Sequence, residues 1–129
     1  GIDNRVRNAA HQQNIIWTST FLDALADLAG APVVITSGYR VPELNARVEG
    51  SASQSRHMTG EAVDFKIPGR FETSYELAQF VHDTGWPFQK IGVYNGQARI
   101  HLQYIPRSGE DANSRRFVYD SVTEEGIAV

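Results

Sequence analysis

Two histidines and one aspartate are the residues whose types and positions could do chemistry in this chain: His57, Asp64 and His101. Two imidazoles and one carboxylate, with a fourth position left for water, form a known ligand set for catalytic zinc. The three residues are far enough apart in the sequence that only the fold can bring them together. Their positions in a site therefore depend on the helices, strands and loops that carry them.

Asp64 falls in a segment whose alternation of side chains predicts a β-strand. One face of this strand would carry only apolar residues: Val63, Phe65 and Ile67. We expect that face to pack on the core and Asp64 to point to the opposite, wetter face. His101 is placed in the same way, on a polar strand face that it shares with Arg99 and Gln103. His57 can reach the same place from the loop before the Asp64 strand.

A simpler interpretation competes with the metal site, because histidine and aspartate on polar strand faces are usually just solvated. Spacing alone does not decide between the two. The other two histidines, His11 and His82, lie in predicted helices, and we interpret them as surface or capping residues. Tyr39 and Tyr94 either border a cleft or are surface turn residues. Four larger aromatic residues are interpreted as core and not as a glycan-binding surface: Trp17, Phe65, Trp86 and Phe88.

The elements that must position these residues are predicted from periodicity and from turn residues. The predicted segments are a helix at 12–29, a strand at 33–36, a short helix that starts at Pro42, a strand at about 61–67, a helix opened by the capping box at 73–76, and a hairpin at 88–105 that turns at Asn95-Gly96. This order indicates an α+β fold, in which a small, largely antiparallel sheet carries the candidate site and helices flank it.

The length and composition bound the possible functions. A chain of 129 residues suits one domain, with a core at about 12–106 and a polar C-terminal extension at 107–129 that we expect to pack loosely. The net charge of −3 argues against nucleic acid as the main partner. The absence of cysteine excludes disulfides, thiolate metal sites and cysteine nucleophiles. No membrane span or signal peptide is visible, although Gly1 could be a processing boundary.

Three short segments contain motifs that can be compared with known families. Residues 35–45 read ITSGYRVPELN, residues 55–64 read SRHMTGEAVD, and residues 100–102 read IHL. In the same order, they resemble the ITSGYRSPELN block, the S-x-H-x-x-G-x-A-x-D signature and the VHV segment of the zinc D-Ala-D-Ala carboxypeptidases, peptidase family M15. The resemblance covers roughly residues 14–105. It implies the hedgehog/DD-peptidase-like fold of that family.

The resemblance implies a zinc enzyme that hydrolyses an amide bond in peptidoglycan stem peptides or their cross-links. His57, Asp64 and His101 would hold one Zn²⁺, and Arg40 would contact a carbonyl oxygen or a carboxylate of the substrate. Ser55 would be either a hydrogen-bond partner near the ligands or a solvated loop serine. The expected location is the periplasmic or extracellular cell-wall space, or a phage lysis or virion protein. A monomer is the default expectation for a small hydrolase domain.

The general base is the point at which the chain departs from the family. Many relatives place an acid three residues before the last histidine, where this chain has Ala98. Two other acid positions of relatives correspond to Gln103 and Gln89, and a second histidine of some relatives corresponds to Arg99. An amide cannot usefully accept a proton at neutral pH, so the base is left unassigned.

Three explanations for this departure stay open. The acid could come from elsewhere in the chain, with Glu61, Asp83, Glu110 and Asp111 as candidates. The enzyme could instead be slow and rely on zinc and Arg40. Finally, the domain could be catalytically silent and bind zinc or cell-wall peptide without turnover. A structural or signalling domain of the same fold is a further alternative from a different functional class.

Overall fold

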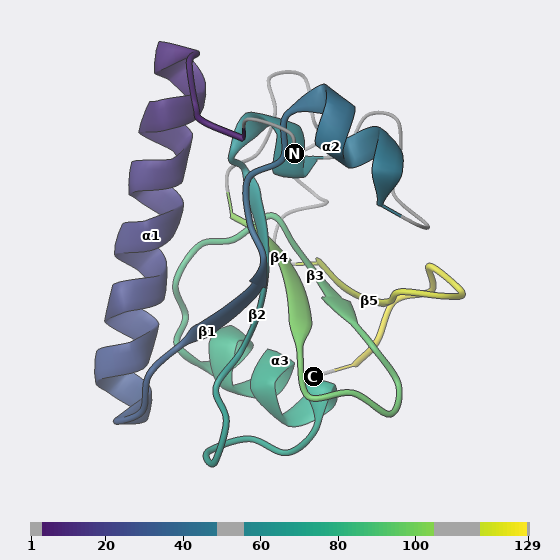
Figure 1. The fold of residues 1–129 in the computed structure, drawn as a ribbon. Coiled ribbons are helices and arrows are strands. Elements are labelled where there is room, and N and C mark those ends of the chain that lie inside the picture. The colour runs from purple at the N-terminus through teal and green to yellow at the C-terminus, as the bar shows by residue number, and fades with distance from the viewer. Residues whose placement is uncertain (1–3, 49–55, 105–116, 129) are drawn as a thin grey trace.

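The computed structural model of the chain describes residues 4–48, 56–104 and 117–128. Helices and strands follow one another in this order: α1 (Ala9–Ala29), β1 (Val34–Ser37), α2 (Pro42–Arg47), the 3-10 turn η1 (Arg56–Thr59), β2 (Ala62–Lys66), α3 (Ser74–Asp83), β3 (Lys90–Val93), β4 (Ile100–Gln103) and β5 (Phe117–Asp120). Figure 1 shows these elements along the chain. No helix of the described residues has the length and hydropathy of a membrane span.

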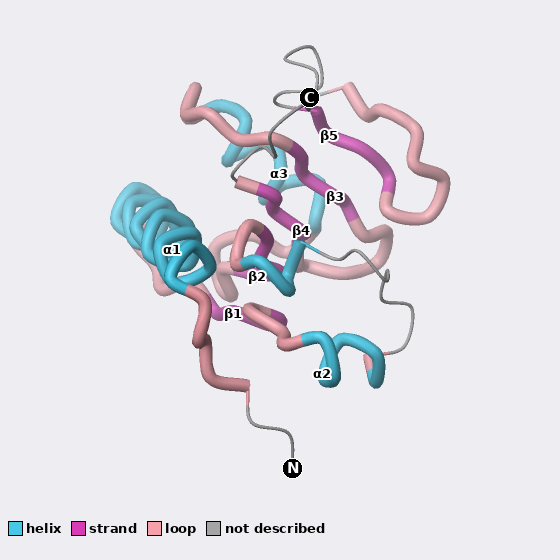
Figure 2. Tube along the Cα trace, turned by 90° about the horizontal axis from the view of Figure 1, so that it is seen from above, coloured by secondary structure: helices cyan, strands magenta, loops and turns pink. Residues whose placement is uncertain are grey.

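The strands form one five-stranded sheet in the order β1-β2-β4-β3-β5. Neighbouring strands are antiparallel, except that β5 runs parallel to β3. The predicted α+β fold with a small, mostly antiparallel sheet is therefore confirmed. Figure 2 shows α1 and α2 on opposite sides of these strands. The sheet thus has one face for the core and another that is free to carry the candidate site.

The core face of the sheet packs against α1 and α3. Fully or almost fully buried apolar side chains of four strands share this face: Val63, Phe65, Ile91, Val93, Ile100, Leu102 and Val118. They pack in one cluster with buried side chains of the two helices, among them Leu25 and Leu77. Because successive side chains of a strand alternate between faces, this packing turns the residues in between to the opposite face. Asp64 and His101 are among those residues.

Local signals in the sequence account for the ends of the helices. Asn8 caps α1 by accepting the backbone N–H of His11, and Gly30 ends the helix with a φ of 68°. Thr73 caps α3 in the same way, through the N–H of Glu76, as its capping-box pattern predicts. Helix α2 begins at Pro42, the position that the sequence predicts.

The C-terminal segment differs from its prediction. We expected residues 107–129 to pack loosely, but Phe117–Asp120 forms the edge strand β5 beside β3. Val118 is only 3% exposed and belongs to the core cluster. The polar composition of this segment gave no sign of the strand, although Val118 is a buried apolar side chain within it. The C-terminal part of the chain therefore contributes to the sheet that carries the candidate site.

Burial corrects two further expectations. Trp17 lies on α1, and we expected it in the core, but it is 51% exposed. Phe65 and Phe88 are buried as predicted, and Trp86 packs at the edge of the core. Asp64 is not on a wet face, because only 5% of its surface is exposed. A buried carboxylate needs partners, and this makes its surroundings informative.

Helix α1 also holds the turn that precedes β2. The Thr18 hydroxyl donates to the carbonyl of Gly60 at 3.1 Å, and the Asn14 amide donates to the carbonyl of Thr59 at 3.0 Å. Gly60 has a φ of 77°, and a Cβ atom there would lie 2.7 Å from Ile15 Cγ1 and 2.9 Å from the His11 carbonyl oxygen. Only glycine therefore fits between the turn and the helix.

The contacts of Gly60 predict a large loss of stability for Gly60→Ala. Gly69→Ala is the matched control, because Gly69 also has a positive φ, of 79°, but open space around it. The control should lose about 1–2 kcal/mol from the left-handed backbone alone. Gly60→Ala should lose about 1–3 kcal/mol more, because a backbone carbonyl lies in the way. Urea unfolding measures both, and equal losses in the two variants would contradict the tight contact with α1.

Candidate metal centre

His57 is positioned by the turn η1 and by the loop that follows β1. Its Nδ1 lies 2.8 Å from the carbonyl oxygen of Gly38. A carbonyl can only accept a hydrogen bond, so Nδ1 carries the proton and donates. The other ring nitrogen, Nε2, is then the one that can take either a second proton or a metal ion, and it faces Asp64 Oδ1 at 3.4 Å. This is the arrangement in which a metal-binding histidine is oriented by a carbonyl behind it.

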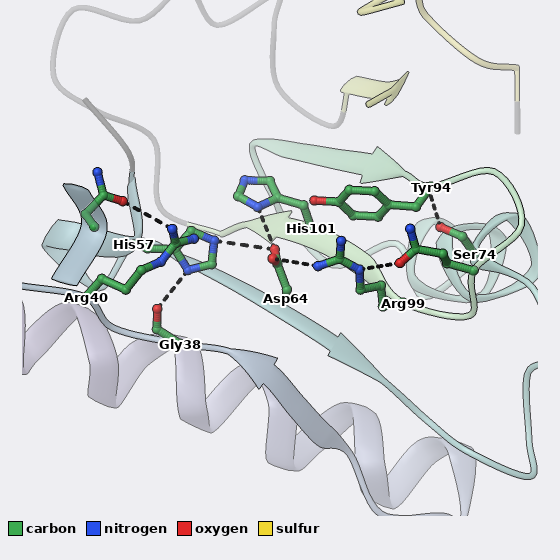
Figure 3. Close-up of polar contacts among 10 residues, drawn as sticks. Gly38, Arg40, His57, Asp64, Ser74, Tyr94, Arg99 and His101 are labelled. Carbon is green, nitrogen blue, oxygen red and sulfur yellow. Dashed lines mark hydrogen bonds and ion pairs between the residues drawn. The ribbon is translucent and has the colours of Figure 1, made fainter. Parts of the chain in front are cut away.

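Asp64 and His101 meet because their strands are paired in register. Asp64 of β2 lies directly opposite His101 of β4. The two side chains lie on the face away from the core, and Asp64 Oδ1 lies 2.8 Å from His101 Nδ1. Figure 3 shows the rings of His57 and His101 both approaching the carboxylate of Asp64. The structure therefore brings together the three residues that the sequence singled out.

The chemistry of Asp64 reflects a contest between burial and its partners. Burial is the largest single effect and by itself would raise the pKa of the Asp64 carboxyl group. Hydrogen bonds with His101 and His57, together with electrostatic attraction to both, outweigh burial and hold the pKa below its ordinary value. The carboxylate is therefore ionised at neutral pH. The lone pairs of Asp64 Oδ1, His57 Nε2 and His101 Nδ1 can each bind a proton or a metal ion. Protons and a metal ion therefore compete for this site.

The geometry of the three side chains fits a small divalent ion. One ligand atom from each residue can be chosen so that all lie within 4.8 Å of one another. Tetrahedral zinc with bonds of about 2.1 Å would separate its ligand atoms by roughly 3.4 Å. The distance between His57 Nε2 and Asp64 Oδ1 is 3.4 Å, and that between His101 Nδ1 and Asp64 Oδ1 is somewhat shorter, at 2.8 Å. His57 and Asp64 are buried, whereas 18% of the His101 side chain is exposed. The donor set thus suits zinc and is accessible from the His101 side.

Arg99 binds the second oxygen of Asp64, a role that sequence reasoning missed. Its Nη1 donates to Asp64 Oδ2 at 3.3 Å, while its Nε donates to Gln97 Oε1 at 2.7 Å. The guanidinium also stacks on the ring of Tyr94, with Cζ 4.1 Å from the ring centroid. Strand alternation already placed Arg99 on the same face as His101, so the signal was present. Because Arg99 binds Oδ2 of Asp64, the other carboxylate oxygen, Oδ1, is the one that faces the two histidines.

Arg40 lies on the other side of the centre, beside His57 (Figure 3). Its backbone N–H donates to the carbonyl of His57 at 2.9 Å, which ties the two segments together. Its side chain is buried, and Nη1 donates to Asn45 Oδ1 at 3.2 Å. Asn45 belongs to α2 and is itself buried. The short helix therefore fixes the direction of the guanidinium.

Gly92 and β5 shape the centre on the side of His101. Gly92 of β3 pairs with His101, and a Cβ atom at Gly92 would lie 3.3 Å from His101 Cβ and 3.1 Å from the Tyr119 hydroxyl. The missing side chain thus leaves room for the phenol that β5 supplies. Burial, followed by the proximity of Tyr94 and Asp64, raises the pKa of Tyr119 to about 12. Its hydroxyl is therefore protonated at neutral pH.

The acids considered as a general base are not brought to the centre within the described residues. Glu61 accepts a short hydrogen bond from the Thr59 hydroxyl, and its other oxygen lies 3.6 Å from Arg56 Nη1. Asp83 is exposed at the end of α3, the helix on the core face of the sheet. In the part of the chain that the structure describes, the cluster of potential metal ligands consists of His57, Asp64 and His101.

Other residues considered in the sequence fall into two groups. Gln89 and Gln103, which occupy acid positions of relatives, are both buried. His82 lies in α3 as predicted, and His11 lies in α1, which begins at Ala9 and not at the predicted residue 12; neither belongs to the cluster of potential ligands. Three further candidates lie outside the described residues: Ser55, Glu110 and Asp111.

Comparison of the chain with known protein families found a match. The family model for peptidase M15 matches residues 2–103, which is most of the chain. The chain belongs to the peptidase M15 family. None of the curated proteins compared with the chain matches it. The match covers α1 through β4 and all three potential ligands of this M15 chain, and the strand β5 lies beyond it.

Membership of the M15 family makes the chain a member of a zinc-dependent metallopeptidase family. The candidate site consists of residue types that zinc binds, with the spacing described above. Both findings agree with the resemblance found in the sequence.

The contact between Arg99 and Asp64 predicts that Arg99→Met weakens zinc binding by about 10–100-fold, because partners behind a ligand typically contribute that much to metal affinity. Arg70→Met is the matched control: Arg70 also stacks on an aromatic ring, that of Phe71, but it hydrogen-bonds to Ala29 and not to the centre. Zinc affinity measured by competition with a chelating dye distinguishes the variants. Unchanged affinity in Arg99→Met would show that Asp64 needs no support from this side.

Proposed function

We propose that this chain is a zinc peptidase that hydrolyses an amide bond in peptidoglycan stem peptides or their cross-links. The observation that carries the proposal is the convergence of His57 Nε2, Asp64 Oδ1 and His101 Nδ1 in a member of the M15 family. These three side chains would hold one Zn²⁺. Bound there, zinc would polarise the scissile carbonyl and lower the pKa of a water molecule to about 7.

The residues around the ligands support hydrolysis by orienting groups. Gly38 holds His57 in the tautomer that presents Nε2, and Arg99 holds the Asp64 oxygen that faces away from the histidines. These contacts orient the ligand atoms before a substrate binds. A preorganised centre of this kind loses little energy to rearrangement during reaction.

Arg40 is proposed as the residue that contacts the substrate. Its guanidinium is buried beside His57 and is held by Asn45. Its Nε has no hydrogen-bond partner among the described residues, so a buried donor is left for a ligand. A guanidinium suits either a carboxylate or a carbonyl oxygen that gains negative charge.

The substrate class rests on the resemblance of the motifs to the zinc D-Ala-D-Ala carboxypeptidases. By that resemblance, the scissile bond involves a D-amino acid, and the partner of the protein is a peptidoglycan peptide. Such a substrate places the protein in the periplasmic or extracellular cell-wall space, or among phage lysis or virion proteins.

A second candidate function is a catalytically silent zinc module that binds cell-wall peptide. It is favoured by the residues at the usual acid positions, which are Ala98, Gln89 and Gln103 in this chain. The engagement of Glu61 with Thr59 and Arg56 points the same way. The peptidase is preferred because the described residues have three features that it needs. These are the ligand geometry, access to the centre from the His101 side, and the buried Nε donor of Arg40.

Turnover distinguishes the two functions. Purified peptidoglycan incubated with the zinc-loaded protein should release new amine termini, and a chelator should abolish the release because the ligands then hold no ion. Zinc added back should restore it. Stoichiometric zinc without new termini would favour the silent module, and the lack of stoichiometric zinc would contradict the metal centre itself.

Replacement of Arg40 tests its contact with the substrate. Arg40→Met should lower kcat/KM by about 100-fold, because a preorganised donor to the reacting oxygen typically contributes a factor of this order. Zinc content should stay at one ion, since Arg40 is not among the potential ligands. Arg47→Met, an exposed position on the same helix as Asn45, is the control. Equal activity of the two variants would remove Arg40 from the mechanism.

A further inference from the structure

Tyr94 directly follows β3 and lies on the site face of the sheet. It is two residues after Gly92, which pairs with His101, so its side chain leaves the strand on the same side as the candidate metal centre. Figure 3 shows the ring pointing from Ser74 toward His101, with the hydroxyl at the end nearest the centre. Electrostatic coupling between Tyr94 and Asp64 agrees with this placement.

Contacts from three directions hold Tyr94 in this position. The buried Ser74 hydroxyl, at the start of α3, accepts the backbone N–H of Tyr94 at 2.9 Å. The N–H of Gln97 donates to the Tyr94 carbonyl at 3.2 Å across the hairpin turn. Arg99 stacks on the ring, and Arg99 is itself bonded to Gln97 and Asp64. The orientation of the phenol is therefore linked to that of a proposed zinc ligand.

The phenol hydroxyl has the chemistry of a donor at this centre. An ordinary tyrosine has a pKa of about 10, so it carries its proton at neutral pH. Burial, and then the charge of Asp64, raise the pKa of Tyr94 further. The hydroxyl makes no hydrogen bond with any residue that the structure describes. A fixed, protonated hydroxyl without an internal acceptor is suited to donate to a bound ligand.

We propose that Tyr94 is a catalytic hydrogen-bond donor, whose hydroxyl binds the carbonyl oxygen of the scissile amide as that oxygen gains negative charge. The proposal rests on the proposed peptidase function. Arg40 beside His57 and Tyr94 beside His101 would then approach the reacting group from opposite sides of Asp64 (Figure 3). Two preorganised donors stabilise a developing oxyanion more than they stabilise the planar amide.

Tyr94→Phe removes only the hydroxyl and keeps the ring on which Arg99 stacks. In the zinc-loaded protein, kcat on peptidoglycan peptides should fall by about 100-fold, with KM within about twofold of the unsubstituted protein. The affinity for a phosphinate analogue of D-Ala-D-Ala, whose tetrahedral oxygens resemble the oxyanion, should fall by a similar factor in calorimetry. Tyr75→Phe is the control, since the exposed Tyr75 hydroxyl bonds only to the Ala128 carbonyl among the contacts described.

The outcomes separate this proposal from the proposed function. Unchanged kcat and unchanged phosphinate affinity in Tyr94→Phe would overturn the donor role. A parallel loss of zinc affinity would overturn it as well, because Tyr94 would then act only by supporting the ligands. If the unsubstituted protein binds zinc but releases no amine termini, the peptidase function fails. The phosphinate comparison still decides whether Tyr94 donates, since no binding, or equal binding, of this probe would refute the donor.

Discussion

The register between β2 and β4 is the constraint on which the rest of the centre depends. It places Asp64 opposite His101. A shift of one residue in either strand would turn one of these side chains to the opposite face. The apolar neighbours Phe65 and Leu102 prevent such a shift, because they are fully buried on the other face and would have to enter a polar environment. The core therefore determines the geometry of a site that lies on the opposite side of the sheet.

The third potential ligand depends on contacts of a different kind. His57 is not on a strand, so neither sheet register nor alternation positions it. Instead, the Gly38 carbonyl orients its ring, and the turn that carries it is bonded to α1 through Gly60 and Thr59. The close approach of Gly60 to α1 requires a glycine with positive φ. Helix α1 thus contributes to the centre indirectly, through a turn and without a side chain of its own at the ligands.

Local patterns explain which parts of this structure could be predicted from the sequence. Caps, the Asn95-Gly96 turn and the alternation around Asp64 are short-range signals, and the elements that they predict are present. Strand β5 has no such signal, because its parallel pairing with β3 joins segments far apart in the chain. The burial of Asp64 and its contact with Arg99 also depend on side chains from separate segments. Periodicity gives the face on which a residue lies, but not what covers that face.

The partners of Asp64 suggest why a departure from the family at the acid positions need not disable the centre. A buried carboxylate is costly unless its oxygens are paired, and here the histidines face Oδ1 while Arg99 bonds Oδ2. Arg99 is held in turn by Gln97 and by the ring of Tyr94. The groups around the ligand are therefore cations and donors, which favour negative charge nearby. In the proposed peptidase, these groups would stabilise an oxyanion directly, and catalysis would then depend less on a carboxylate that removes protons than on donors that are already in place.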